Sequence, residues 1–426
     1  MNMKYRIPAI VLGLSVNGLG VIRSLARNGV KVYAMDSDED NPSMRTRYAT
    51  CLICPDVRKN PEAFKQFLLD LTQKIGGQAV LFPTGDNFNG FVHQYRHQLK
   101  GALKFNMPDG PVMAKLLNKK GQWELAQEHG VPVPRTFFPQ TSERVKILAR
   151  QIIYPVLLKG LSTGDWRQKF GDQKAVIAND AQELIEAYAS IHFLGHIDPV
   201  VQEVIGGDDT RHFKICAYFN REGTPLLTFT LQKIRQYPCD FGIGSSVKSI
   251  REPEVARLGL EFMKKIGYKG VGSIEFKKDK RDEEWKMIEV NPRLWAQNSL
   301  PEACGQNFAF TAYLDMLGEK VEPKTDFTEG IKWIAFNADR SSFSGYRKQG
   351  RMTWAQWLKS ILTGPRVWAV WAWDDPMPFL ASIHFGLLPV KKILIKLTKL
   401  SSGSIDNLNV SKRELPANNS LGLRGR

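Results

Sequence analysis

The sequence predicts two successive architectures in one chain, a doubly wound α/β sheet and then an α+β substructure. The first prediction rests on an apolar run at 7–13, a glycine-rich turn, an amphipathic helix to about Arg27 and a second strand at 30–35. Apolar strands joined by helices are typical of parallel sheets that are covered on both faces. The second prediction rests on residues 152–290, where alternating strands follow one another with few helices between them.

Composition excludes the disordered, fibrous and disulfide-based classes of protein. Apolar residues make up 43% of the chain and charged residues 24%, close to the globular average. Five cysteines, an odd number spread over a long chain, argue against a disulfide framework and favour a reducing cytoplasm. The chain begins with a direct run into an apolar strand, so we expect no signal peptide and a cytoplasmic location.

Three patterns look like binding sites, but the sequence favours a structural interpretation of each. The turn after the first strand has Ser15 where a dinucleotide fingerprint needs glycine, which disfavours a nicotinamide cofactor held by Asp36. Cys51 and Cys54 form a lone Cys-x-x-Cys without a second ligand pair, so half-buried thiols are favoured over zinc. Two histidine pairs at i,i+4 also lack a third ligand: 93 with 97, and 192 with 196.

The pattern that carries chemistry is a predicted hairpin over residues 271–293. A turn centred near 281–283 places Glu275 and Glu289 opposite each other, and facing carboxylates repel unless a cation lies between them. Apolar flanks indicate enclosed acids rather than the alternative of a solvated surface hairpin. Mg²⁺ prefers carboxylate, amide and phosphate oxygens. We therefore predict a Mg²⁺ site, with Mn²⁺ as the alternative, on Glu275, Glu289 and Asn291, and an anion clamp at Arg293.

The run Glu-Val-Asn-Pro-Arg at 289–293, preceded by a strand glutamate, resembles the metal-binding signature of the ATP-grasp superfamily. Three other motifs stand in the family's order. Lys119 precedes a Gly-Val-Pro-Val-Pro exit, Lys159 ends Tyr-Pro-Val-Leu-Leu-Lys, and residues 202–206 read Gln-Glu-Val-Ile-Gly. The resemblance covers roughly residues 1–320. It implies a Rossmann-like N-terminal domain followed by an ATP-grasp fold.

The resemblance also implies contacts with ATP. Two lysines would meet the phosphates and the adenine side, and the segment 203–205 would meet the adenine edge mostly through its backbone. The loop at 160–171, which departs from the family in two bulky side chains, would close as a lid. The implied residues are Lys119, Lys159, Ser162, Gly164, Glu203, Val204, Ile205, Asp209 and His212, the last two being alternatives for the ribose.

The activity that the resemblance implies is that of a carboxylate–amine ligase. A substrate carboxylate would attack the γ-phosphate of ATP, and an amine would then attack the acyl phosphate, releasing ADP and phosphate. Lys214, Arg235 and Arg293 would meet the phosphoryl groups or the oxyanion, which makes them the implied catalytic residues. Two alternatives stay open: an enzyme with a non-amine acceptor or with phosphorylation alone, and a non-catalytic nucleotide-binding protein.

The composition changes beyond residue 318. Residues 340–426 hold fourteen Lys and Arg against four Asp and Glu, and five of the ten tryptophans lie at 354–373. Such a region suits an anionic membrane surface, with the protein peripheral on the inner face, or else completion of the core or the substrate pocket. Nucleic acid is the weaker partner, because no known module accompanies the charge. The predicted boundaries are 1–110, 111–325, a Trp-rich basic region at 326–400 and a disordered tail at 401–426.

Overall fold

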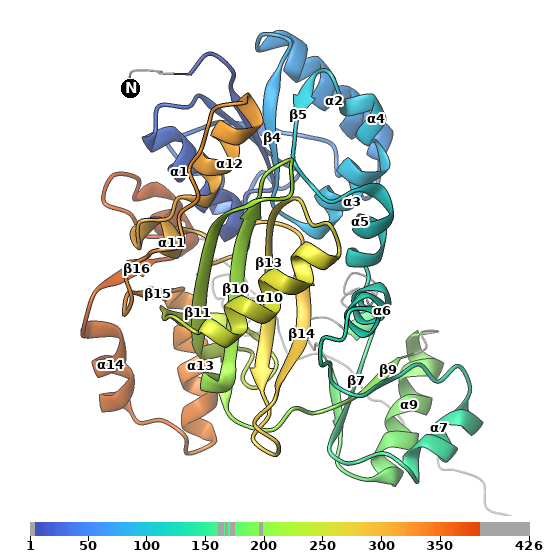
Figure 1. Cartoon of the computed structure of the whole chain (residues 1–426). Helices are drawn as coiled ribbons and strands as arrows, with labels where there is room; N and C mark the ends of the chain where they lie inside the picture. The colour runs from blue at the N-terminus through green and yellow to red at the C-terminus, as the bar shows by residue number, and fades with distance from the viewer. Residues whose placement is uncertain (1–4, 161–165, 167–168, 171–174, 196–198, 384–426) are drawn as a thin grey trace, which may run out of the picture. The chain divides into compact units, whose positions relative to one another are not determined.

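A computed structural model describes the chain over residues 5–160, 166, 169–170, 175–195 and 199–383. The chain divides into two compact units, Met1–Phe379 and Leu380–Arg426, and every strand and helix labelled in Figure 1 belongs to the first. Within the described ranges, no helix is both long and apolar enough to cross a bilayer.

The N-terminal part is a five-stranded parallel sheet with the order β3-β2-β1-β4-β5. Every residue of the central strand β1 is fully buried, as expected for a strand covered on both faces. The predicted doubly wound sheet is therefore confirmed. Its strands are β1 (Ala9–Leu12), β2 (Val32–Asp36), β3 (Thr50–Ile53), β4 (Ala79–Pro83) and β5 (Leu103–Lys104). Its helices are α1 (Val16–Arg27), η1 (Pro42–Arg45), α2 (Pro61–Lys74), α3 (Asp86–Gln94) and α4 (Arg96–Leu99).

The turn between β1 and α1 is fixed by a glycine and by Asp36. Gly13 has a φ of +88°, and a Cβ atom there would lie 2.7 Å from the Phe88 ring. The Asp36 carboxylate accepts hydrogen bonds from the backbone N–H of Leu14 at 2.8 Å and from Nδ2 of Asn41 at 3.1 Å. Asp36 thus holds the turn together, in agreement with the structural interpretation of this motif.

A small antiparallel sheet with the order β6-β9-β7-β8 follows two connecting helices. Helices α7 and α9 pack together beside it, as Figure 1 shows. The connecting helices are α5 (Gly110–Leu116) and α6 (Lys119–Glu128). The sheet and its helices comprise β6 (Thr136–Phe137), α7 (Ser142–Ala149), β7 (Val156–Lys159), β8 (Val176–Ala178), α9 (Ala181–Gly195) and β9 (Val200–Glu203).

The largest sheet has seven strands in the order β14-β13-β10-β11-β12-β15-β16, all antiparallel except the last pair. Helix α10 packs on β10 and β11, and α13 packs on β11 and β12 (Figure 1). The strands are β10 (His212–Phe219), β11 (Pro225–Tyr237), β12 (Ile243–Ser249), β13 (Gly270–Lys278), β14 (Trp285–Asn291), β15 (Lys332–Ile334) and β16 (Arg366–Trp368). The helices are η2 (Asp209–Arg211), α10 (Pro253–Lys265), α11 (Ser299–Ala303), α12 (Phe308–Leu317), α13 (Phe336–Lys348) and α14 (Trp354–Leu362).

Part of the Trp-rich region completes this sheet and its core. Strands β15 and β16 come from that region and extend the sheet beyond β12. Trp357 is buried and stacks on Phe343, with ring centroids 4.8 Å apart. Trp354 and Trp373 are 50% and 88% exposed. The tryptophans therefore divide between the core and the surface.

Candidate nucleotide and metal site

Strands β13 and β14 form the hairpin expected from the sequence, with the predicted register. Glu275 pairs with Glu289 across the ladder, and Ser273 pairs with Asn291. Because side chains alternate along a strand, positions two residues apart share a face. One face of the hairpin thus presents two carboxylates, an amide and a hydroxyl.

Two lysines on neighbouring strands neutralise Glu275. Nζ of Lys214 on β10 lies 3.0 Å from one carboxylate oxygen, and Nζ of Lys233 on β11 lies 3.7 Å from the other. Burial would raise the pKa of Glu275, but the two lysines outweigh burial and hold the pKa well below its ordinary value. Glu275 is therefore ionised, the form in which a carboxylate binds a metal.

An open cavity of about 260 Å³ is lined by Glu275 and both lysines. His212 Nδ1 and Gln297 Oε1, from two other lining residues, are buried and lack a hydrogen-bond partner among the described residues. Burial, and then the nearby lysines, hold the pKa of His212 well below its ordinary value, so its ring is neutral at neutral pH. Buried polar groups are normally satisfied. The unpaired ring nitrogen of His212, the unpaired amide oxygen of Gln297 and the charges of Glu275 and the two lysines suit a metal ion with phosphate groups.

Arg293 follows the hairpin and joins it to the N-terminal part of the chain. Its Nε and NH2 donate to the two carboxylate oxygens of Asp86 at 2.6 Å and 3.2 Å. Burial would lower the pKa of Arg293, but Asp86, and then Glu289 and Glu275, raise it. The guanidinium group therefore lies within the electrostatic field of both hairpin acids, and its planar fork matches a carboxylate.

Lys119 and Lys159 come close enough to repel each other. Lys159, at the end of β7, donates to Gln202 Oε1 at 2.7 Å and lies 5.0 Å from the centre of the Trp123 ring. Burial, followed by the charge of Lys119, holds the pKa of Lys159 well below its ordinary value, and Glu289 opposes that shift. A bound anion would relieve the repulsion between the two lysines.

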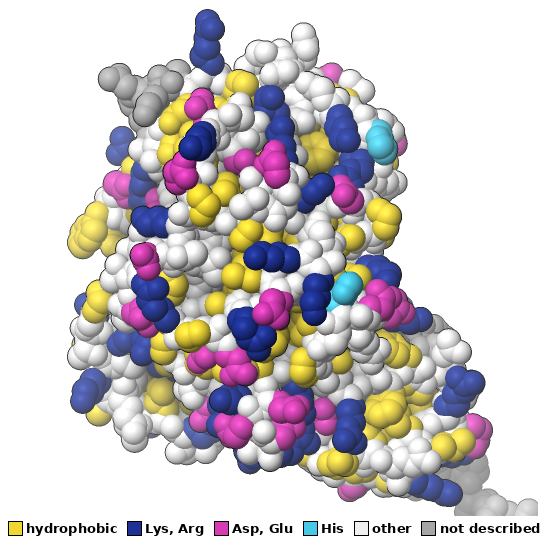
Figure 2. All heavy atoms as spheres, viewed as in Figure 1, with side chains coloured by type: hydrophobic (Ala, Val, Ile, Leu, Met, Phe, Trp, Pro, Cys, Tyr) yellow, Lys and Arg dark blue, Asp and Glu magenta, His cyan; other side chains and the backbone are white. Residues whose placement is uncertain are grey.

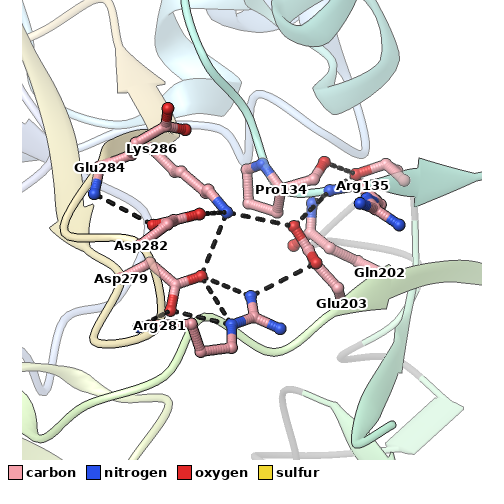
Figure 3. A network of polar contacts seen from close by, with 10 residues as sticks. Pro134, Arg135, Gln202, Glu203, Asp279, Arg281, Asp282, Glu284 and Lys286 are labelled. Carbon is pink, nitrogen blue, oxygen red and sulfur yellow. Dashed lines mark hydrogen bonds and ion pairs between the residues drawn. The ribbon is translucent and has the colours of Figure 1, made fainter. Parts of the chain in front are cut away.

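The carboxylate of Glu203 is held in a network that joins the small sheet to the hairpin turn, as Figure 3 shows. It accepts from the backbone N–H of Arg135 at 2.9 Å and forms ion pairs with Arg281 at 3.4 Å and Lys286 at 3.8 Å. Both cations also bind Asp279, which is fully buried. The Glu203 side chain is thus engaged in linking the small sheet to the hairpin turn.

Two predicted site residues, Arg235 and Asp209, are engaged in buried contacts with other side chains. Arg235 is 2% exposed and forms a two-pronged ion pair with the buried Asp339 of α13 at 2.8 Å and 2.9 Å. The register of β11 against β12 shifts between Lys233 and Arg235, so the regular alternation assumed for these strands is broken. Asp209 is also buried, and its carboxylate accepts hydrogen bonds from Gln236 and Tyr346. Gln236 accepts in turn from Nζ of Lys233 at 3.1 Å, so Asp209 lies one side chain away from the lysines that bind Glu275.

Two further residues stand at the site without having been predicted. Lys233 reaches Glu275, and Gln297 lines the same cavity. Lys233 lies at the polar end of its strand, two residues before Arg235, so neither Lys233 nor Gln297 carried a distinguishing signal in the sequence. Ser162 and Gly164 lie outside the described residues, as does most of the predicted lid at 160–171. Val204 and Ile205 follow directly on β9.

The thiols of Cys51 and Cys54 are poor metal ligands. Burial raises the pKa of Cys51 to about 11 and that of Cys54 to about 12, so both remain protonated at neutral pH. In the described ranges no cluster of three or more His, Cys, Asp and Glu side chains could hold a metal. The proposed metal ligands on the hairpin are not such a cluster, because they comprise two carboxylates and one amide. Phosphate oxygens would complete the coordination of the metal.

The hairpin segment matches a protein-family model. Residues 249–320, which include both hairpin strands, match the model described as carbamoyl-phosphate synthase L chain, ATP binding domain. A curated relative, D-aspartate ligase of Enterococcus faecium, is 23% identical over 312 residues, covering 70% of this chain and 74% of the relative.

Solved structures share the fold. Biotin carboxylase of Campylobacter jejuni superimposes with a TM-score of 0.58 at 20% identity, covering 74% of this chain and 72% of that one. N5-carboxyaminoimidazole synthetase of Staphylococcus aureus also gives a TM-score of 0.58, at 16% identity, covering 77% and 82%. The order of the sheets, the facing acids of the hairpin and these similarities show that the chain has an ATP-grasp-like fold and resembles carboxylate–amine ligases.

Proposed function

We propose that the chain is an ATP-dependent, ADP-forming ligase that joins a carboxylic acid to an amine. The observation that carries the proposal is the pair Glu275 and Glu289, which face each other beside Asn291 in a site with buried lysines. Two carboxylates that face each other repel and destabilise a sheet unless a cation lies between them. In phosphoryl-transfer enzymes such carboxylates bind the Mg²⁺ that accompanies the nucleotide. The named activity of the E. faecium relative supports the same class.

Glu275, Glu289 and Asn291 would hold Mg²⁺, with Mn²⁺ as the alternative ion. The metal would neutralise the charge that gathers on the transferring phosphoryl group. Lys214 and Lys233, which form ion pairs with Glu275, would then be available to phosphate oxygens.

The reaction proceeds in two displacements. A carboxylate oxygen of the acid attacks the γ-phosphorus of ATP, the bond to the β-phosphate oxygen breaks, and ADP leaves. The amine nitrogen then attacks the acyl carbon, loses a proton, and phosphate leaves as the amide forms. Arg293 supports both steps, because its fork can hold the acid and later stabilise the oxyanion. Lys119 and Lys159 would hold the nucleotide phosphates.

ADP release is the test of this proposal. Pools of acids, beginning with D-aspartate because of the relative's name, are screened against pools of amines for acid-dependent ADP release. Hydroxylamine replaces the amine to distinguish the alternatives, since acyl hydroxamate with ADP reports an acyl phosphate. A non-amine acceptor would give hydroxamate but no amide with any amine. Glu289→Gln serves as the blank, and unchanged ADP release in that variant rejects the assignment.

We also propose an anionic membrane surface as a partner, through α14. The outward residues of this helix, Trp354, Leu358 and Leu362, are 50%, 43% and 63% exposed and recur every fourth residue. Residues 340–373 contain six Lys and Arg and no acid. Figure 2 shows Lys and Arg side chains spread over one face of the protein together with Asp and Glu. Tryptophan and cations together suit a lipid interface. Flotation with phosphatidylglycerol vesicles at low salt should carry the wild type but not Leu358→Ser/Leu362→Ser; absence of wild-type binding ends the proposal.

A further inference from the structure

Arg293 lines a second cavity, which shares no lining residue with the cavity beside Glu275. It has an open volume of about 440 Å³ and is lined by residues of β4, the segment after β5, β10, α12 and the end of the hairpin. Its walls are mainly apolar, with Phe82, Phe105, Met107 and Leu294 among them. Arg293 lines this cavity, and its pKa is set partly by the hairpin acids, so the cavity borders the proposed site of phosphoryl transfer.

One polar side chain in this cavity lacks a partner. Asn89 is 1% exposed, lines the cavity, and its Nδ2 finds no hydrogen-bond partner among the described residues. Leaving a buried donor unsatisfied destabilises a fold by about 1–3 kcal/mol, so such a group usually awaits a ligand or a water molecule. Nδ2 of Asn89 could therefore donate a hydrogen bond to an acceptor on a ligand bound in this mainly apolar cavity.

Asp86 shows how a carboxylate binds Arg293 at the edge of this cavity. It stands three residues before Asn89 on α3, and both of its oxygens accept from Arg293 in the two-pronged geometry that guanidinium groups form with carboxylates. Asp86 is 62% exposed at its side chain while Arg293 is 17% exposed, so Asp86 can swing into solvent at little cost.

We infer that the acid substrate is a small carboxylic acid with a second hydrogen-bond acceptor, and that its carboxylate displaces Asp86 from Arg293. The body of the acid enters the apolar cavity and its acceptor meets Nδ2 of Asn89. Asp86 is thus a placeholder that competes with the substrate. This inference rests on the proposed function for the role of Arg293, but binding of the acid can be measured without catalysis.

Calorimetry without nucleotide tests the inference with two acids of similar shape, succinamate and 4-methylpentanoate, of which only the first carries the second acceptor. Asp86→Asn removes the competing charge, and an exposed ion pair is worth up to about 1 kcal/mol, so Kd for succinamate should fall about two- to fivefold. Asp70→Asn, at an exposed position on α2, is the matched control and should change nothing. Asn89→Leu should abolish the preference for succinamate over 4-methylpentanoate.

Several results would overturn the inference. Weaker or unchanged succinamate binding in Asp86→Asn would show that Asp86 supports the acid or has no part in binding it. Failure of both acids to bind either protein at millimolar concentration would remove the cavity as the acid's place. Because these measurements involve no ATP, they can fail while acid-dependent ADP release, and its loss in Glu289→Gln, still stand.

Discussion

Replacement of Arg235 by Met should destabilise the fold severely rather than act on the chemistry. Arg235 and Asp339 are 2% and 0% exposed, and the guanidinium is bound to both carboxylate oxygens. Asp339 also accepts from Trp357 Nε1 at 2.8 Å and from Ser245 Oγ at 3.3 Å, two neutral donors that cannot balance its charge. Breaking a buried pair by removing one partner costs about 3–5 kcal/mol. We expect Arg235→Met to lose that much free energy of unfolding.

Urea unfolding followed by circular dichroism measures this loss, with ADP release assayed on the folded protein. Arg257→Met is the matched control, because its pair with Glu261 is half exposed at both ends and should matter by about 0.5 kcal/mol. The double variant Arg235→Met/Asp339→Asn should recover part of the loss, since it removes the stranded charge. A stable Arg235→Met protein with a hundredfold lower kcat would refute the structural role and restore the catalytic one.

Three other predictions concern charged pairs elsewhere in the chain. Lys214→Met should let the pKa of Glu275 rise towards its ordinary value. The rate of Mg²⁺-dependent ADP release, measured against pH, should then begin to fall at a higher pH on the acid side; an unchanged pH profile would contradict the pairing of Lys214 with Glu275. Arg27 lowers the pKa of Asp374 to about 2, so Asp374 adds stability above about pH 4 that is lost as pH falls towards 2. The free energy of unfolding of Asp374→Asn should therefore not show this decrease between about pH 4 and pH 2. If the wild type and the variant have the same dependence of unfolding on pH, the Arg27–Asp374 pair does not contribute this stability. Lys286→Met should loosen the Glu203 network and raise KM for ATP several-fold with little change in kcat; unchanged KM would argue against a link between that network and nucleotide binding.

The hairpin could be predicted from sequence because its information is local. The charged turn fixes the approximate register, and a register shift between Glu275 and Phe276 then brings Glu275 opposite Glu289 rather than Ile288. The first parallel strands could also be predicted from the sequence, since β1 is uniformly apolar. Lys119, Lys159 and the segment 202–206, by contrast, were predicted from the family resemblance rather than from any periodicity in this chain.

The remainder of the site depends on contacts between residues far apart in sequence. Arg235 and Asp339 are separated by 104 positions, and the register shift in β11 that accompanies Arg235 has no local sequence mark. Strand β12 was missed because glycine and serine weaken its alternating pattern. Lys233 shares the polar end of β11 with Arg235, so the sequence did not distinguish it, and its partner Glu275 became clear only with the order of the sheet.

Acid-dependent ADP release, with hydroxylamine as the trap, tests the central claim most directly. The wild type should release ADP only with Mg²⁺ and an accepted acid, and should form the acyl hydroxamate in equal amount. Glu289→Gln, which keeps the shape of the side chain but removes one of the two facing charges, should lower that rate by at least about a hundredfold, as expected when a charge-stabilising group of about 3 kcal/mol is lost. Equal rates in the two proteins would contradict the metal site, and ADP without hydroxamate would contradict the acyl phosphate.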